Sequence, residues 1–289
     1  MRRLLILGAL LGLLSGCMTA PVKYDAKASY ALNVARAANI DSDLKDTDVP
    51  QETMASFSDS AAYGFAYAAS GYNAPVKGFT PGSAAAMNFV SWLLAPESKS
   101  ARNYLIAWMP EEQAGDAPVN HLAEILLEAS NKAAVELGFT TEDIVVEKDG
   151  IKPKMVGVSL LKNDGEVCTA KEGPTVCWMA FGVEKPRHID HTPELVEFEG
   201  ISYFFDPSKS FRSYFMFPKE NHGLDELELL LKTSQYTPDW VYFYAAPDKI
   251  RVGKEQPIKI PLVIHQGKAR YFVKPVEDQP VANLESSEQ

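Results

Sequence analysis

One short run of the sequence gathers residue types that bind metal ions. His188, Asp190 and His191 fall within four consecutive positions, between Pro186 and Pro193. Imidazole nitrogens and carboxylate oxygens are common zinc ligands, and a catalytic zinc site takes three protein ligands plus water. A solvated loop between the two prolines is the competing interpretation. We favour the loop, because only three other histidines remain in the chain to complete a site.

The order of these residues is similar to the second half of the His-x-His-x-Asp-His motif of metallo-β-lactamase-like hydrolases. Pro186 stands where that motif has its first histidine. The resemblance implies a hydrolase in which His188, Asp190 and His191 are metal ligands. Because the first ligand is missing, we predict no metal and no cofactor, and we keep these three residues as the candidate site of the alternative hydrolase.

Other catalytic signals are weak. The chain has no Gly-x-Ser-x-Gly elbow, no Ser-x-x-Lys accompanied by its partner motifs, and no Gly-x-x-x-x-Gly-Lys phosphate loop. Glu194, Glu197, Glu199 and Asp206 are close in sequence, and a glycosidase needs two carboxylates about 5 to 10 Å apart. Spacing along the chain does not determine whether any two of them converge in space, so a non-catalytic protein is the favoured prediction.

Two cysteines in the middle of the chain are spaced for a hairpin. Cys168 and Cys177 flank the turn-forming run Lys171-Glu172-Gly173-Pro174. Folding the chain about this turn places the two sulfurs opposite each other, so we predict a cross-strand disulfide. Two buried free thiols, or metal ligands, are the alternatives.

The N-terminus predicts export. Arg2 and Arg3 precede eleven uncharged residues, Leu4 to Leu14, a run too short to span a bilayer as a helix. Leu14-Ser15-Gly16-Cys17 then resembles the lipobox of bacterial lipoproteins. This resemblance implies cleavage before Cys17 and attachment of acyl chains to that residue, which together anchor a protein stably.

The resemblance also implies a cellular location. In such lipoproteins an aspartate directly after the lipidated cysteine often signals retention in the inner membrane, and Met18 takes that place here. We therefore expect the outer membrane, with the body in the periplasm. Loss of the leader leaves 26 basic and 38 acidic residues, a net charge of about −12. That balance disfavours a nucleic-acid partner.

The chain divides into five predicted parts. Residues 1–16 are the signal peptide, 17–27 a lipidated tether, 28–100 a mainly helical segment, 101–276 an α+β body and 277–289 a disordered tail. Helical patterns occur at 28–38, 120–137 and 224–232. Strand composition occurs at 102–109, 144–146, 155–161, 177–183, 201–205, 213–217, 240–245, 258–264 and 269–273.

These elements predict the fold class. Without regular strand-helix alternation, they indicate an α+β fold with a largely antiparallel sheet covered by helices and an apolar helical N-terminal part. The strand at 240–245 is apolar on both faces, so we expect it to be central. Aromatic residues from Tyr203 to Tyr244 are interpreted as sheet core, with a sugar- or peptide-stacking face as the alternative.

A segment of low charge favours a contact function. Residues 60–96 contain Lys77 as their single charged residue. Their apolar helices must be buried, either in the protein's own core or against another protein, another copy or the membrane. We predict a non-catalytic scaffold or assembly component of the cell envelope or of an envelope-spanning complex. A membrane-anchored envelope hydrolase and a glycan- or small-molecule-binding lipoprotein are the alternatives.

Overall fold

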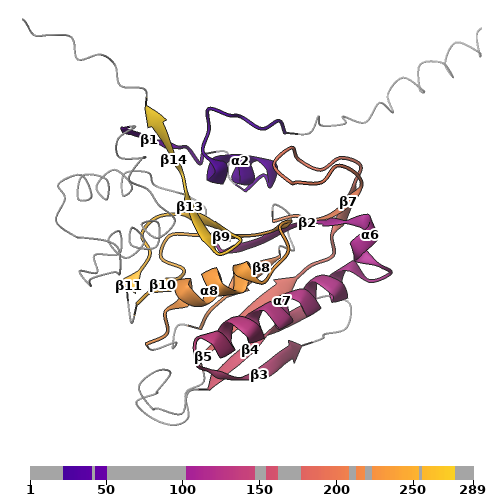
Figure 1. Cartoon of the computed structure of the whole chain (residues 1–289), viewed down its shortest axis with the longest axis vertical. Helices are drawn as coiled ribbons and strands as arrows, with labels where there is room; N and C mark the ends of the chain where they lie inside the picture. Colours follow the sequence, from indigo (N-terminus) through magenta and orange to yellow (C-terminus); the bar gives the residue numbers. More distant parts are fainter. Residues whose placement is uncertain are drawn as a thin grey trace, which may run out of the picture.

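The computed structural model describes residues 22–40, 43–50, 102–146, 154–161, 177–207, 213–218, 223–253 and 256–276 (Figure 1). The predicted signal peptide, Cys17, Cys168, the segment 60–96 and the tail 277–289 lie outside these residues. Within them, two antiparallel sheets pack with helices around one continuous hydrophobic core. The predicted α+β class, with its largely antiparallel sheet, is confirmed.

The larger sheet has six strands in the order β13-β12-β9-β2-β7-β6, and each neighbouring pair is antiparallel. Its strands are β2 (Tyr104–Pro110), β6 (Arg187–Ile189), β7 (Ser202–Phe205), β9 (Val241–Ala245), β12 (Leu262–His265) and β13 (Lys268–Tyr271). Every residue of β2 and β9 is buried, as the prediction of a central strand requires.

The smaller sheet has four strands in the order β3-β4-β5-β8, again antiparallel throughout. Its strands are β3 (Thr140–Val146), β4 (Lys154–Leu161), β5 (Cys177–Val183) and β8 (Tyr214–Met216). Helix α7 (Pro118–Glu136) lies along one face of this sheet, as Figure 1 shows. Its buried residues Leu122, Leu126, Ala129 and Ala133 recur every three or four positions, which gives the apolar stripe expected for such a helix.

Helix α8 (Glu226–Gln235) lies beside α7 and covers part of the larger sheet. The Asp225 carboxylate caps its first turn by accepting the Glu228 N–H at 3.0 Å. Leu227 and Leu230 are fully buried. The two sheets meet through aromatic rings, since Phe243 of β9 contacts both Phe181 of β5 and Phe215 of β8.

The N-terminal described residues pack on the larger sheet. Helix α2 (Tyr30–Ala37) contacts β12 and β13. Strand β1 (Thr47–Pro50) then pairs in parallel with β14 (Val273–Val276), the last described strand. Short pieces complete the structure: helix α6 (Glu111–Ala114) and the pair β10 (Arg251–Val252) and β11 (Gln256–Pro257).

Several details differ from the sequence predictions. Helix α7 begins at Pro118, two positions before the helical pattern at 120–137, because proline fits the first turn of a helix. The helix does end before Gly138, whose φ of +81° suits glycine. The strand expected over 258–264 begins only at Leu262, although Ile258 and Ile260 before it are buried.

Candidate functional site

The three candidate metal ligands lie on and just after the edge strand β6. The His188 Nε2 atom is 3.3 Å from the Glu111 Oε1 atom, and its ring meets the ring of Tyr203 edge-on. Asp190 and His191 follow in an exposed turn. Among the described residues, no group of three or more histidine, cysteine, aspartate or glutamate side chains is placed to hold a metal ion.

Two of the four carboxylates considered for glycoside hydrolysis, Asp206 and Glu194, have other partners. The largely buried Asp206 carboxylate forms an ion pair with Arg187, in which Asp206 Oδ2 lies 3.2 Å from Arg187 Nε. The same guanidinium lies over the Phe204 ring. Glu194 accepts the backbone N–H of Tyr24 through Oε2 at 3.1 Å. Both carboxylates are therefore used to join segments of the fold.

The remaining chemical predictions have different outcomes. Cys177 is fully buried on β5, while Cys168 lies outside the described residues, so the disulfide stays a prediction. Among the described aromatic residues from Tyr203 to Tyr244, Phe204, Phe205, Tyr242 and Phe243 are essentially inaccessible, whereas Tyr236 is 36% exposed. The core interpretation is confirmed for the four buried rings, because a stacking face for sugars needs exposed, adjacent rings.

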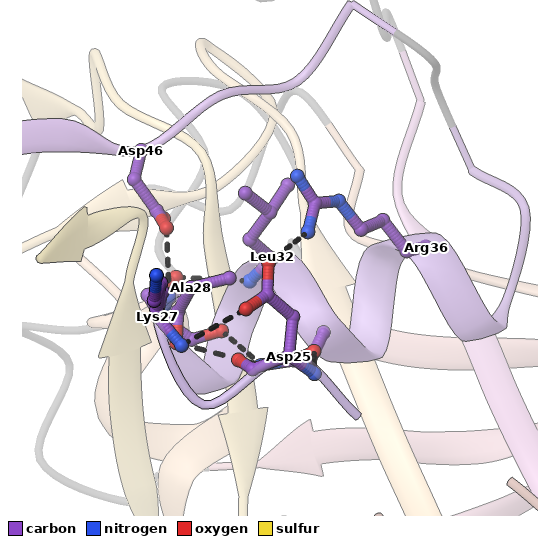
Figure 2. Close-up of polar contacts among 8 residues, drawn as sticks. Asp25, Lys27, Ala28, Leu32, Arg36 and Asp46 are labelled. Atoms are coloured by element: carbon purple, nitrogen blue, oxygen red, sulfur yellow. Dashed lines mark hydrogen bonds and ion pairs between the residues drawn. The ribbon is translucent and has the colours of Figure 1, made fainter. Parts of the chain in front are cut away.

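The part of the predicted tether that the structure describes is fixed to helix α2. Asn33 is buried, and its Oδ1 atom accepts the Asp25 N–H at 2.9 Å while its Nδ2 donates to the Asp25 carbonyl at 2.9 Å. Figure 2 shows Asp25 bonded to the Lys27 N–H and to Arg36, and Asp46 approaching the start of the helix. The Asp46 carboxylate accepts the Ser29 N–H at 2.7 Å.

These contacts make a compact junction between the N-terminal segment and the body. The bond from the Lys27 N–H, followed by the Arg36 guanidinium, holds the pKa of Asp25 below its ordinary value. Asp25 therefore remains charged in this turn. We call residues 24–33, with Asp46, the N-terminal clamp.

A second cluster joins α2 to the larger sheet through aromatic and imidazole rings. The His265 ring stacks on Tyr242 with centroids 4.1 Å apart and planes 11° apart. Its Nε2 is 2.6 Å from the Asp239 carbonyl oxygen, and its Nδ1 is 3.1 Å from the Tyr30 hydroxyl. A carbonyl oxygen can only accept, so Nε2 carries the proton and Nδ1 accepts from Tyr30.

The protonation of this cluster follows from its burial. Burial lowers the pKa of His265 and raises the pKa of Tyr30 and of Tyr242, so all three groups favour the neutral form. The Tyr242 hydroxyl lies 3.5 Å from that of Tyr30. The hydrogen bonds from Tyr30 to His265 and from His265 to the Asp239 carbonyl dock α2 on the larger sheet, and the sequence shows no motif for them.

The edge strand β3 differs from the rest of the body in its exposure. Five of its seven residues are exposed. Val145 and Val146 are 53% and 44% accessible, and Val135 at the end of α7 is 63% accessible. Figure 1 shows β3 at the outer margin of the molecule, beside α7. No described strand other than β4 pairs with β3, and exposed apolar side chains beside such an edge are a typical contact site for another chain.

Comparison with known protein families, known proteins and solved structures finds no match for this chain. Within the ranges that the structure describes, no helix is long and apolar enough to cross a membrane.

Proposed function

We propose that this protein is a lipoprotein of the bacterial outer membrane that acts by protein contact. In this proposal Cys17 carries the lipid anchor, and the α+β body serves as a non-catalytic scaffold or assembly component of the envelope or of an envelope-spanning complex. The support for the address is the leader and the run Leu14-Ser15-Gly16-Cys17.

The main structural support for a role in protein contact is the exposed edge strand β3. Soluble proteins usually protect a long sheet edge, because its free N–H and C=O groups pair readily with another strand. Here a seven-residue edge ends in the apolar run Ile144-Val145-Val146, with both valines exposed. A partner that covers this edge would remove the apolar surface from water, which stabilises association.

The N-terminal clamp supports the same role by limiting the reach of the anchor. Tyr24 is bonded to Glu194 of the body and follows Cys17 by seven positions. Seven extended residues span at most about 25 Å. A lipid on Cys17 would hold the body close to the bilayer, where a scaffold for membrane assemblies is needed.

Crosslinking in intact cells tests this proposal. The full-length protein, tagged at its C-terminus, is crosslinked with formaldehyde and purified from the membrane fraction. We expect a discrete complex that contains another protein in a fixed ratio. Recovery of the protein alone, together with measurable hydrolysis of glycan, peptide or ester substrates, would contradict the contact role and favour the anchored hydrolase.

A further inference from the structure

Strand β3 is the longest edge that the two described sheets present. At the opposite edge of the smaller sheet, β8 has three residues, and the carbonyl of Ser213 just before it accepts the Leu105 N–H of β2. In the larger sheet, β6 also has three residues, and β13 is contacted by α2. Only β4 pairs with β3 among the described strands.

The two faces of β3 can be assigned from its contacts. The Asn131 Nδ2 atom of α7 donates to the Asp143 Oδ1 at 2.8 Å, so Asp143 points to the α7 side. Successive side chains alternate between faces, so Val145 lies on the α7 side as well. Glu142, Ile144 and Val146 occupy the opposite face. An added strand would therefore meet an exposed valine on each face.

Along β3, two acidic residues are followed by three apolar residues. Glu142 and Asp143 are exposed and form no ion pair with a described basic side chain, while the next three residues are apolar. β3 contains no lysine, arginine, proline or glycine. Lysine and proline are the usual means by which an edge strand repels a new neighbour, and both are missing here.

This order disfavours full-length pairing between two copies of β3. Parallel pairing in register would set Glu142 and Asp143 beside their own copies. Antiparallel pairing centred on Asp143 opposes two carboxylates, and pairing centred on Ile144 sets Asp143 against Val145 and Glu142 against Val146. Like charges opposite each other destabilise a strand pair, and a carboxylate facing a valine gains nothing.

We propose that β3 binds an extended segment of a different protein, which adds to the sheet as an antiparallel strand with apolar residues followed by lysine or arginine. The apolar residues would lie opposite Val146, Val145 and Ile144, and the basic residues opposite Asp143 and Glu142. Main-chain bonds supply affinity in such strand addition, and side chains on the two faces supply specificity. This inference rests on the proposed contact function and names the partner's chemistry.

Peptide binding to the mature, lipidated protein in detergent tests the inference. The probe is a fluorescent heptapeptide, Thr-Ile-Val-Val-Lys-Lys-Thr, and its control carries glutamate in place of both lysines. We expect saturable binding of the basic peptide that weakens with added salt, and slower hydrogen exchange confined to residues 140–146. Equal binding of both peptides, no saturable binding, or protection elsewhere would overturn the inference.

A charge reversal gives the matched control. Glu142→Lys should weaken binding of the basic peptide by about two- to fivefold, which matches the usual contribution of an exposed ion pair to affinity. The same substitution should strengthen binding of the acidic peptide. Glu124→Lys makes the same charge change at an exposed position of α7, outside β3, and should leave the preference unchanged. Equal effects of the two substitutions, or β3-dependent dimers, would overturn the inference.

The two proposals can fail separately. If the crosslinked complex persists in cells that carry Glu142→Lys and Val145→Asp together, the scaffold role stands and strand addition at β3 is wrong. If the peptide binds as expected but the protein is recovered alone with hydrolase turnover, strand binding stands and the scaffold role is wrong.

Discussion

A single imidazole connects the N-terminal helix to the C-terminal hairpin. The His265 ring is bonded on one side to the Asp239 carbonyl and on the other to the Tyr30 hydroxyl. Its charged neighbours are Arg270, whose guanidinium lies over the Tyr30 ring, and the carboxylates of Asp239 and Glu197. Burial outweighs the two carboxylates, so the neutral ring is the stable form.

This balance predicts a pH dependence of stability. Because burial lowers the pKa of His265 in the folded state, the unfolded chain takes up the proton first as the pH falls. The stability that His265 contributes should be complete above pH about 6.5 and should decline toward and through the lower folded-state value. This pH dependence can be measured by urea unfolding of the mature protein between pH 8 and 5, with tryptophan fluorescence as the signal.

The controls for this prediction are two glutamine variants. His265→Gln should flatten the fall in stability below pH about 6.5 relative to the parent. His191→Gln, at an exposed position, should leave the profile parallel to that of the parent. A His265→Gln profile that stays parallel to the parent would contradict the assignment.

The buried amide of Asn33 is the second critical residue. Asn33→Ala should lower the free energy of unfolding by about 1 to 3 kcal/mol, because it leaves the Asp25 N–H without its partner and leaves the Asp25 carbonyl with only the Ala28 N–H. It should also speed tryptic cleavage after Lys23 and Lys27. Arg36→Gln should cost less, since both members of the Arg36–Asp25 pair are about half exposed. A larger cost for Arg36→Gln would contradict the clamp.

At the scale of the elements, the smaller sheet depends on a close approach of two strands. A methyl group added at Gly157 of β4 would lie 2.1 Å from the Met179 carbonyl oxygen and 2.7 Å from the Ala180 Cα of β5. Both atoms belong to the backbone, so they can move only if the strands separate. Gly182 instead faces the Tyr214 ring, at 2.4 Å from its nearest atom.

Substitution of these glycines separates the two cases. Gly157→Ala should destabilise the protein by about 2 to 3 kcal/mol, the cost of overpacking against rigid atoms. Gly182→Ala should cost about 1 kcal/mol, because the Tyr214 ring can rotate away. Denaturant unfolding measures both, and equal stabilities of the two variants would contradict the strand register.

The predicted hairpin between Cys168 and Cys177 has its own test. If the two cysteines are bridged, peptide mapping without reductant should find their peptides linked, and Cys168→Ser should lower the free energy of unfolding by about 2 to 3 kcal/mol. Reductant should lower the parent's stability by a similar amount and leave the variant unchanged. A parent that is insensitive to reductant and shows unlinked peptides would contradict the pairing.

The sequence predicted those elements whose signals are local. Helix α7 follows from the helical pattern at 120–137, in which Leu122 and Leu126 are buried, and strand β13 follows from the strand composition at 269–273. An ion pair between Glu128 and Lys132, four positions apart and 2.6 Å long, lies on the exposed face of this helix. The strands β1, β6 and β14 were not predicted, because they are short and β1 and β14 pair across more than 220 positions.

The candidate sites depend on distant contacts, which limited their prediction. Tyr30, Tyr242 and His265 come together only after the sheet has formed, and no spacing in the sequence signals it. The run Ile144-Val145-Val146 was recognised as a strand, but such a run is typical of a buried strand. Its exposure follows from the position of β3 at the end of the strand order.

For the whole molecule, the central claim is that a lipid on Cys17 holds this body at a membrane. The clamp fixes the chain from Tyr24 onward, so the anchor and the body would be joined by a short segment. Contact through β3 would then occur beside the bilayer. Without the lipid, the body would no longer be held beside the bilayer, whichever partner β3 binds.

Mass spectrometry of the mature N-terminal peptide, purified from the membrane fraction, tests this claim most directly. The account predicts a peptide that begins at Cys17 and carries a thioether-linked diacylglycerol together with an acyl chain on its amino group. Cys17→Ser should abolish both additions and release the protein from the membrane. An unmodified residue at the mature N-terminus, or a leader still attached, would contradict the account.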